Sequence, residues 1–511
     1  MGDFANPSSN MLSIRAKSIA VVGAGPSGLV AAKYLRAEKA FSKIVLFEQR
    51  PRDGGIWNYT SEERDEDLFT VPQTNPSGKN QEPIWKHEMS GPTHNESNGV
   101  NGVSKYPAFV SPMYERLETN IPRGLMGFKD LDWPQDSQLF PKHQTVLKYI
   151  EDYGRDVQDT VRYATQITDV TPTCEDPASS WSVTSRDLKT SATKTETYDA
   201  VIVANGHFIT PYIPEIRNIA DWNKAHPGVI SHSKYYRRPE EFTGKKVVVV
   251  GNSASGADIS NQIAEHCALP LLWSSKSTNL FVSATPTDSR RHELPPIKAF
   301  HPSTRGVEFE DGTVETDVDA IVFATGYFYS LPFLAKVEPK LITDGSHVNH
   351  TYKHLFYAAQ PTLSFLALPQ RVIPFPVAEA QASVLARVYS GRLPLPPLSE
   401  MENWEQETKA EAGDGRAFHL LPFPKDGQYI NELSDWALSA PAKDELDNEG
   451  RGMVPPRWGE WEFWCRENFP AIRQAFGKLG EKRFETRSLQ EVGFSYDEYK
   501  KGKAKEDAKL V

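Results

Sequence analysis

The sequence contains few cysteines and no cysteine pair. Its 511 residues include three cysteines, Cys174, Cys267 and Cys465, which lie far apart. Without a Cys-x-x-Cys spacing we expect neither a disulfide framework nor the dithiol centre of a disulfide reductase. The His-Glu-x-x-His motif, clustered His and Cys ligand spacings and a Ser-His-Asp order are also missing. Metal binding and hydrolysis therefore have little support, and we expect no metal.

Long apolar runs and an excess of basic residues are absent as well. No stretch approaches the roughly 18 apolar residues of a membrane span, and the N-terminus lacks the apolar segment of a signal peptide. The formal net charge is −10, which does not favour contact with the phosphate backbone of a nucleic acid. We therefore expect an acidic cytoplasmic protein with neither a membrane nor a nucleic-acid partner.

Two glycine-rich turns are the most informative features that the sequence does contain. Residues Ile19 to Gly28 read IAVVGAGPSG, and residues Val247 to Gly256 read VVVVGNSASG. An apolar strand that breaks into Gly-x-Gly-x-x-Gly and then into a helix is typical of dinucleotide binding. The sequence therefore predicts an α/β fold with two Rossmann-like domains and two nucleotide cofactors.

The first turn has the context of a complete fingerprint. Gly23 permits the tight bend, Gly25 lets the backbone approach a pyrophosphate, and Gly28 lets the helix pack on the strand. Glu48 lies twenty residues beyond Gly28, at the end of the next strand, where a carboxylate can accept hydrogen bonds from ribose hydroxyls but would repel a 2′-phosphate. FAD or NAD is therefore expected here. The glycine pair before Ile56 and Trp57 is compatible with an extended FAD and equally with a structural turn.

The second turn differs from the first in its charged surroundings. Serine replaces the middle glycine, at Ser253, and no acidic residue ends the next strand, which runs into Ser274, Ser275, Lys276 and Ser277. A lysine flanked by hydroxyls suits a 2′-phosphate. This favours NADPH over NADH, and the alternative is an exposed lysine on a loop.

The order of these patterns along the chain predicts an inserted domain. We expect the first part of the domain that carries the first turn at residues 1–208, with a long loop or lid at 60–112. The smaller domain that carries the second turn follows at 209–328, and the second part of the first domain, with a helical C-terminal region, occupies 329–511.

Periodicity and loop signals support expectations at a finer level. We predict helices over Ala257–His266 and Val377–Tyr389. His347, His350 and His354 lie in a loop-like segment, and we interpret them as solvent-exposed.

Several motifs together resemble the flavin-containing monooxygenases, a branch of the class B flavoprotein monooxygenases. They span about Ser18 to Pro397. Besides the turns, the matching segments are Gly54-Gly55-Ile56-Trp57, MYERLETNIPRGLMGF at Met113 to Phe128, Asn205 to Pro211, Ala324 to Tyr327, and Gly228-x-x-x-His232-x-x-x-Tyr236-Arg237. The last segment has His226 where the family usually has phenylalanine. The Baeyer–Villiger branch would have Trp-Pro in place of Tyr236 and Arg237, so the heteroatom-oxidising branch is favoured.

The resemblance implies an activity and a set of contacts. NADPH would reduce FAD, and a C4a-hydroperoxyflavin formed with O2 would oxygenate a nucleophilic nitrogen or sulfur of a small molecule. Asn120 would be the catalytic residue beside the flavin, although an Asn before Ile-Pro is often a turn residue. His232 would hydrogen-bond within the interdomain linker. The implied FAD-binding residues are Gly23, Gly25, Pro26, Ser27, Gly28, Glu48, Gln49, Gly55, Trp57, Thr119, Ile167 and Gln381. The implied NADPH-binding residues are Tyr236, Gly251, Ser253, Ala254, Ser255, Lys276 and Ser277.

Three other functions share the nucleotide motifs. An NADPH oxidase would release only hydrogen peroxide, a Baeyer–Villiger enzyme would convert ketones to esters, and a non-catalytic nucleotide sensor would turn nothing over. The sequence names no substrate, and a homodimer is the default expectation for such enzymes.

Overall fold

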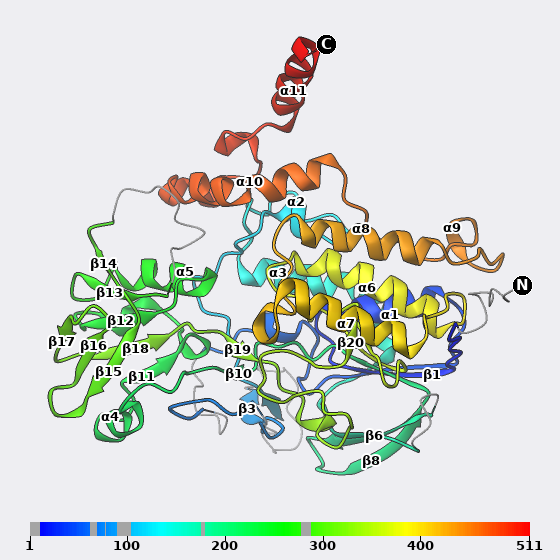
Figure 1. Ribbon diagram of the computed structural model, residues 1–511, viewed down its shortest axis with the longest axis horizontal. Coiled ribbons are helices and arrows are strands. Elements are labelled where there is room, and N and C mark those ends of the chain that lie inside the picture. The colour runs from blue at the N-terminus through cyan, green and yellow to red at the C-terminus, as the bar shows by residue number, and fades with distance from the viewer. Residues whose placement is uncertain are drawn as a thin grey trace, which may run out of the picture.

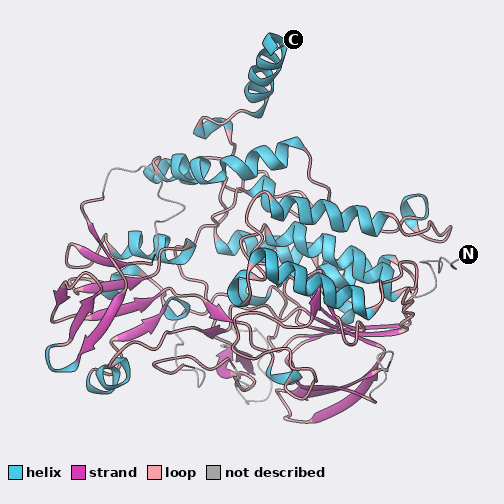
Figure 2. Cartoon of the chain, in the orientation of Figure 1, coloured by secondary structure: helices cyan, strands magenta, loops and turns pink. Residues whose placement is uncertain are grey.

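Two main sheets, a larger one that is mostly parallel and a smaller one that is wholly parallel, form the framework of the protein together with the helices that flank them (Figures 1 and 2). The computed structural model describes residues 11–61, 69–76, 78–88, 104–174, 179–276 and 288–510, without the side chains of 506–510. The strand-rich region at the left of Figure 2 contains the smaller sheet. The larger sheet lies below the main stack of helices on the right. This arrangement confirms the predicted fold class.

The larger sheet draws its strands from two distant parts of the chain. Its order is β20-β21-β22-β9-β1-β2-β5, and its strands from β22 to β5 are parallel. Its members are β1 (Ser18–Val22), β2 (Lys43–Phe47), β5 (Val161–Arg162), β9 (Ala200–Val203), β20 (Thr351–Tyr352), β21 (Phe356–Tyr357) and β22 (Leu363–Phe365). The strands β1 and β9 are almost wholly buried and apolar, as expected of parallel strands that are covered on both faces.

Helices cover one face of this sheet and a second sheet covers the other. The helices α1 (Pro26–Ala37) and α6 (Pro374–Tyr389) pack together above it, and β6 (Thr165–Pro172), β7 (Trp181–Asp187) and β8 (Thr193–Tyr198) lie below it (Figure 1). The helix α6 begins three residues before the predicted Val377 because Pro374 occupies its first turn, where a proline ring is preorganised for a helix.

The smaller sheet has the order β11-β18-β12-β13-β14 and is entirely parallel. Its strands are β11 (Ile230–His232), β12 (Val247–Val250), β13 (Leu271–Ser274), β14 (Arg291–Leu294) and β18 (Ala320–Phe323). The helix α5 (Ala254–Ile263) covers one face and starts three residues before the predicted Ala257, directly after the glycine turn. The helix α4 (Ile219–Ala225) and the antiparallel strands β15 (Ile297–His301), β16 (Gly306–Phe309) and β17 (Val314–Glu315) complete this region.

Two short strands connect the regions. The strands β10 (Thr210–Pro211) and β19 (Tyr327–Phe328) pair antiparallel where the chain leaves and rejoins the larger sheet. The predicted domain boundaries fall beside these strands, and the division itself stays a prediction.

The segment 60–112 is not only a loop. Within its described residues, β3 (Ile84–Glu88) and β4 (Ser104–Ala108) form an antiparallel hairpin, which the polar, glycine-rich composition of the segment did not indicate. The short helix α2 (Arg123–Met126) and the longer α3 (His143–Tyr153) follow.

Helices dominate the C-terminal region. They are α7 (Leu398–Ala412), α8 (Lys425–Leu438), α9 (Asp447–Gly450), α10 (Glu460–Gly477) and α11 (Tyr496–Leu510). The helix α8 packs on α6, whereas α11 projects away from the rest of the molecule at the top of Figure 1. Among the described residues, no helix is both long enough and apolar enough to span a bilayer.

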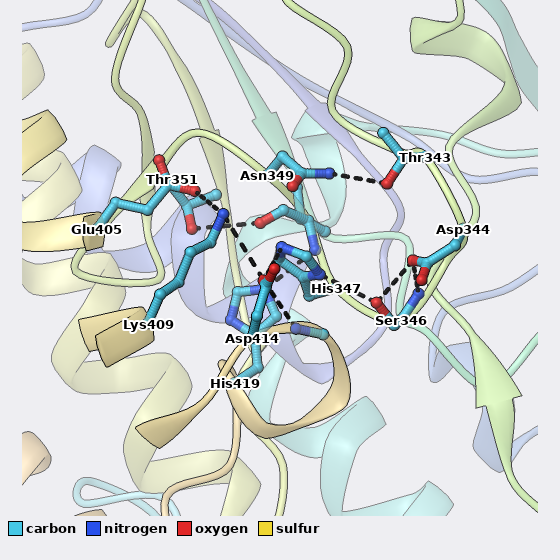
Figure 3. A network of polar contacts seen from close by, with 12 residues as sticks. Thr343, Asp344, Ser346, His347, Asn349, Thr351, Glu405, Lys409, Asp414 and His419 are labelled. Atoms are coloured by element: carbon cyan, nitrogen blue, oxygen red, sulfur yellow. Dashed lines mark hydrogen bonds and ion pairs between the residues drawn. The ribbon is translucent and has the colours of Figure 1, made fainter. Parts of the chain in front are cut away.

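A polar network with a buried histidine cluster and an exposed Asp414 joins α7 and the turn after it to the larger sheet (Figure 3). The His419 Nε2 accepts the Val348 backbone N–H at 3.2 Å, so the proton of this neutral ring lies on Nδ1, which is 3.0 Å from Nδ1 of His354. Asp414 lies 3.4 Å from Nε2 of His347. The predicted exposure of His347 and His354 is therefore wrong, since they are only 5% and 2% exposed.

Candidate functional site

A cleft opens at the carboxyl ends of the strands of the larger sheet, where ligands bind in open α/β folds. The space within the cleft, including the part that is open to solvent, is about 650 Å³. Four of the predicted FAD-binding residues, Gly23, Glu48, Gln49 and Ile167, lie on its wall. These residues come from the first turn, the end of β2 and strand β6. The three elements therefore meet at one cavity.

Glycine is required in the first turn by its geometry. Gly23 has a φ of +104°, and a Cβ there would lie 2.7 Å from the carbonyl oxygen of Ala204. A Cβ on Gly28 would lie 2.0 Å from the carbonyl oxygen of Gly23, so the start of α1 can approach the turn only without a side chain. Pro26 and Ser27 open this helix, whose N-terminus is suited to a phosphate.

The second glycine pair lies directly against the first turn. A Cβ on Gly25 would lie 3.5 Å from the Cα of Gly55, and the backbone N–H of Gly54 donates to the carbonyl of Ala24 at 3.1 Å. Trp57 ends this short 3₁₀ turn and packs, partly buried, on the main core. The sequence left two interpretations of this glycine pair open, a structural turn and a contact with an extended cofactor. The structure has a turn here, and the position of that turn beside Gly25 is also compatible with the cofactor contact.

Glu48 is held in place by the backbone. Its carboxylate accepts the N–H of Ala24 and the N–H of Arg50, each at 2.9 Å. Burial raises the pKa of this carboxyl, and the Arg50 guanidinium and the two N–H donors oppose the rise. Glu48 is 3% exposed but lines the cleft, so it is positioned to meet a polar group that enters there.

The second turn repeats the geometry of the first. Gly251 has a φ of +109°, and a Cβ there would lie 2.5 Å from the carbonyl oxygen of Ala324. A Cβ on Gly256 would lie 2.1 Å from the carbonyl oxygen of Gly251. Ser253, Ala254 and Ser255 form the exposed or half-exposed start of α5. Each sheet therefore offers a helix N-terminus over a glycine turn.

Lys276, which we predicted to contact the 2′-phosphate of NADPH, follows the second strand of the smaller domain's nucleotide-binding unit. Lys276 is exposed, two residues beyond the end of β13. Ser277 lies outside the described residues. An exposed ammonium at the end of the second strand suits an anionic group on a nucleotide.

Thr119 and Asn120 lie beside α3 rather than on the cleft wall. The N–H of Thr119 donates to the carbonyl of Pro141 at 2.9 Å, and its hydroxyl donates to the carbonyl of Ile121 at 2.9 Å. Asn120 is exposed. Its predicted role beside the flavin stays a prediction.

Two predicted contact residues have their side chains inside the protein. The amide oxygen of Gln381, on the fully buried part of α6, accepts the N–H of Ala367 at 2.7 Å, and its nitrogen donates to the Tyr429 hydroxyl at 2.9 Å. The hydroxyl of Tyr236 is 3.0 Å from Oε1 of Gln262, and its ring belongs to the core around α5. The structure thus does not bring these two side chains to the cleft or to the exposed part of the second turn.

His232 holds the connection between the two sheets. Its Nδ1 accepts the N–H of Lys234 at 3.1 Å, so the other ring nitrogen carries the proton and donates to the carbonyl of Gly326 at 3.0 Å. Complete burial lowers the pKa of this histidine to about 3. A neutral imidazole with both nitrogens engaged is suited to positioning the linker.

The cleft also has polar wall residues that the sequence did not reveal. Gln166 donates to the carbonyl of Gln81 at 2.7 Å and to the side-chain oxygen of Gln49 at 3.0 Å. Asn205, two residues beyond the end of β9, lines the same cleft. A polar residue within a strand does not by itself indicate a ligand-binding position. Gln166 reaches the cleft only because of where β6 lies in the folded protein.

Comparison with known families agrees with this geometry. A family model described as flavin-binding monooxygenase-like matches residues 95–289 and 296–447. A model described as a NAD(P)-binding Rossmann-like domain matches residues 21–86. Together they confirm FAD and NADPH as the cofactors, while the residues that hold each one stay predictions.

Individual relatives give the same result. The chain is 32% identical over 400 residues to flavin-containing monooxygenase FMO GS-OX-like 4 of Arabidopsis thaliana, covering 76% of this chain and 79% of the relative. It is 30% identical over 478 residues to flavin-containing monooxygenase iboF of Amanita muscaria, covering 83% and 89%. Among solved structures, S-allyl-L-cysteine S-oxygenase from Allium sativum matches with a TM-score of 0.71 and 27% identity over 94% of this chain and 97% of that one.

Proposed function

Because the chain belongs to the flavin-containing monooxygenase family, we propose that it uses FAD and NADPH to oxygenate a nucleophilic sulfur or nitrogen of a small molecule with O2. The observation that carries this proposal is the repeated turn geometry. Gly23 and Gly251 have φ values of +104° and +109°, and each lies below the N-terminus of a helix on its own sheet. Two nucleotides are what a reaction between a flavin and a nicotinamide requires.

The turns differ in the charge beside them, which supports one cofactor for each. Glu48 lies in the cleft of the first turn and would accept from the ribose of FAD, whereas Lys276 follows the second turn and would pair with the 2′-phosphate of NADPH. When bound, the cofactors supply hydride transfer and oxygen activation. In this proposal the chain binds and orients them, and Asn120 offers a side-chain amide beside the flavin.

Sulfur is the first substrate atom to test. One relative whose structure matches over almost the whole chain is named as the S-oxygenase of S-allyl-L-cysteine, a thioether. Tyr236 and Arg237 stand where the Baeyer–Villiger branch would have Trp-Pro, which supports a heteroatom substrate over a ketone.

The test is a substrate screen with the FAD-loaded enzyme. NADPH consumption, oxygenated product and hydrogen peroxide are measured with thioethers, thiols, amines, hydroxylamines and, for comparison, ketones. We expect a thioether or amine to raise NADPH consumption and to yield its oxide. Esters from ketones would favour the Baeyer–Villiger alternative, peroxide alone would favour an oxidase, and protein that binds no flavin would overturn the proposal.

A further inference from the structure

A short segment of the chain, residues 114–120, crosses between two cores of the protein. Tyr114 belongs to the core cluster around α5, and Leu117 packs against the same cluster. Ile121, directly after the segment, belongs to the core between the larger sheet and its helices. This crossing segment (residues 114–120) ends at Asn120, the residue predicted to lie beside the flavin. Its position therefore depends on contacts with both parts of the protein.

The first half of the crossing segment is attached to the region around α5. The Tyr114 hydroxyl donates to the carboxylate of Asp258, on α5, and the same carboxylate accepts the side-chain amide of Gln262 at 3.0 Å. Arg116 forms an ion pair with Glu240, which lies in the 3₁₀ helix before β12. A shift of this half would therefore change its position relative to the helix whose N-terminus lies over the second glycine turn.

The second half is held by the C-terminal region. The carboxylate of Glu118 lies 3.2 Å from Nε of Arg483 and 3.6 Å from Nη2 of Arg473. Arg483 belongs to the 3₁₀ helix Gly480–Glu485, and Arg473 belongs to α10, where its Cζ is 5.0 Å from the ring centre of Phe140. The side chain of Glu118 is only 9% exposed, so loss of its cations would leave a poorly solvated charge.

Arg473 also acts on the first half of the crossing segment. Burial raises the pKa of Asp258, the partner of Tyr114, and the positive charge of Arg473 opposes this rise. The family model ends at residue 447, so both arginines lie outside the part of the chain that the family match describes. The C-terminal region thus adds its own contacts to a segment that the family match includes.

We propose that Glu118, Arg473 and Arg483 are positioning residues for the proposed reaction. They fix the crossing segment, so that Asn120 and the start of α5 keep one arrangement and the two cofactors are aligned for hydride transfer. This rests on the proposed function. A displacement of about 1 Å at a reacting group can lower a rate by as much as about 100-fold, so a small shift of the segment would be measurable.

The test is the anaerobic reduction of bound FAD by NADPH, in which a hydride passes to the flavin and NADP⁺ remains. Stopped-flow absorbance over a range of NADPH concentrations separates the limiting rate from the dissociation constant. Glu118→Gln, which removes the charge and keeps the shape, should lower the limiting rate about 10-fold. It should leave the dissociation constant of NADPH within about twofold, and it should alter the visible circular dichroism of the bound FAD.

Variants of Arg473 test whether the two residues act together. Arg473→Gln should also lower the limiting rate, and Arg473→Lys, which keeps the charge, should restore most of it. The double variant Glu118→Gln, Arg473→Gln should be no slower than Glu118→Gln alone, because residues that act through one contact are not additive.

Lys478→Gln is the matched control, since Lys478 is an exposed cation directly after the end of α10. It should behave as the wild type does. The proposal is overturned if Glu118→Gln and Arg473→Gln keep the wild-type limiting rate, or if they lower it only in proportion to a loss of bound FAD. A wild-type enzyme whose FAD is not reduced by NADPH would reject the proposed function and this proposal with it, whereas variants that match an active wild type would reject this proposal alone.

Discussion

Gly28 and Gly256 occupy equivalent positions below the two helices, and each leaves no room for a methyl group. An added Cβ would lie 2.0 Å and 2.1 Å from the carbonyl oxygens of Gly23 and Gly251. Both contacts are with backbone atoms of the turns, which cannot move without changing the surface offered to a phosphate. The two positions therefore separate the cofactors experimentally.

We predict that Gly28→Ala abolishes retention of FAD, whereas Gly256→Ala keeps FAD and loses affinity for NADP⁺. Each overpacked turn should also cost roughly 1–3 kcal/mol of stability. Flavin absorbance per protein and calorimetric NADP⁺ binding measure the outcome. Gly477→Ala, at the end of α10 with no atom within 4 Å of the added methyl, is the control and should change neither. Loss of FAD from Gly256→Ala alone would contradict the assignment of the turns.

The residues that could be predicted from the sequence are those whose role depends on local spacing. The strand, turn and helix around Gly23, together with Glu48 at the next strand end, are fixed by short-range geometry. Tyr236 and Gln381 show the limit of this reasoning, because only the packing of distant helices places their side chains inside the core. The contact of Arg473 with Glu118 also depends on a distant helix, which no local signal indicates.

Among the single elements, helix α6 has a carboxylic acid side chain, that of Glu379, buried in the core. Glu379 is 0% exposed, and its carboxylate accepts the backbone N–H of Lys129 at 3.1 Å. Burial raises its pKa to about 8, so the folded protein holds this proton over a pH range in which the unfolded chain has lost it. The contribution of Glu379 to the free energy of unfolding is fully present below the pKa of the unfolded chain, about 4.3. This contribution is lost as the pH rises through the folded-state pKa of about 8.

Glu379→Gln should therefore unfold at a higher midpoint than the wild type at about pH 8.5, with a smaller difference at about pH 5. The glutamine oxygen can still accept the Lys129 N–H. Thermal unfolding monitored by circular dichroism at both pH values measures this. Glu400→Gln, at an exposed position of α7, should change neither midpoint; a difference that does not depend on pH would contradict the account of Glu379.

The turn after α7 depends on the pair formed by His354 and His419. Burial lowers the pKa of His354 to about 3, whereas the unfolded chain binds a proton near pH 6.5. Between these values the unfolded state carries more protons, so stability falls as the pH falls, by about 1.4 kcal/mol per pH unit for this group. These partners lie sixty-five residues apart in the chain, so no local pattern indicates that they are buried together.

His354→Gln should lower the unfolding midpoint at about pH 7.5, because the contact with His419 is lost, and the deficit should shrink at about pH 5.5. The comparison is made by thermal unfolding of the FAD-loaded protein. His350→Gln, a half-buried neighbour, serves as the control and should show the same offset at both pH values. A deficit of His354→Gln that grows in acid would rule out this role for the pair.

At the scale of the whole molecule, the two sheets meet at the strands β10 and β19, and His232 ties the linker to Gly326 beside them. The alternation of strands, turns and helices made this α/β architecture predictable. The hairpin β3–β4 was not predictable, because its strands lack an apolar alternation. The separation of the turns onto two sheets gives one chain two separate helix N-termini, each behind its own glycine turn.

We propose that the protein uses reducing equivalents from NADPH to put an atom of O2 into a nucleophilic substrate. The most direct measurement follows oxygen-18 gas during turnover of the FAD-loaded enzyme with NADPH and the thioether or amine found by screening. We expect one oxygen-18 atom per product molecule, none when the label is in water, and product formed in proportion to NADPH consumed. Unlabelled product, or NADPH consumption matched entirely by hydrogen peroxide, would contradict it.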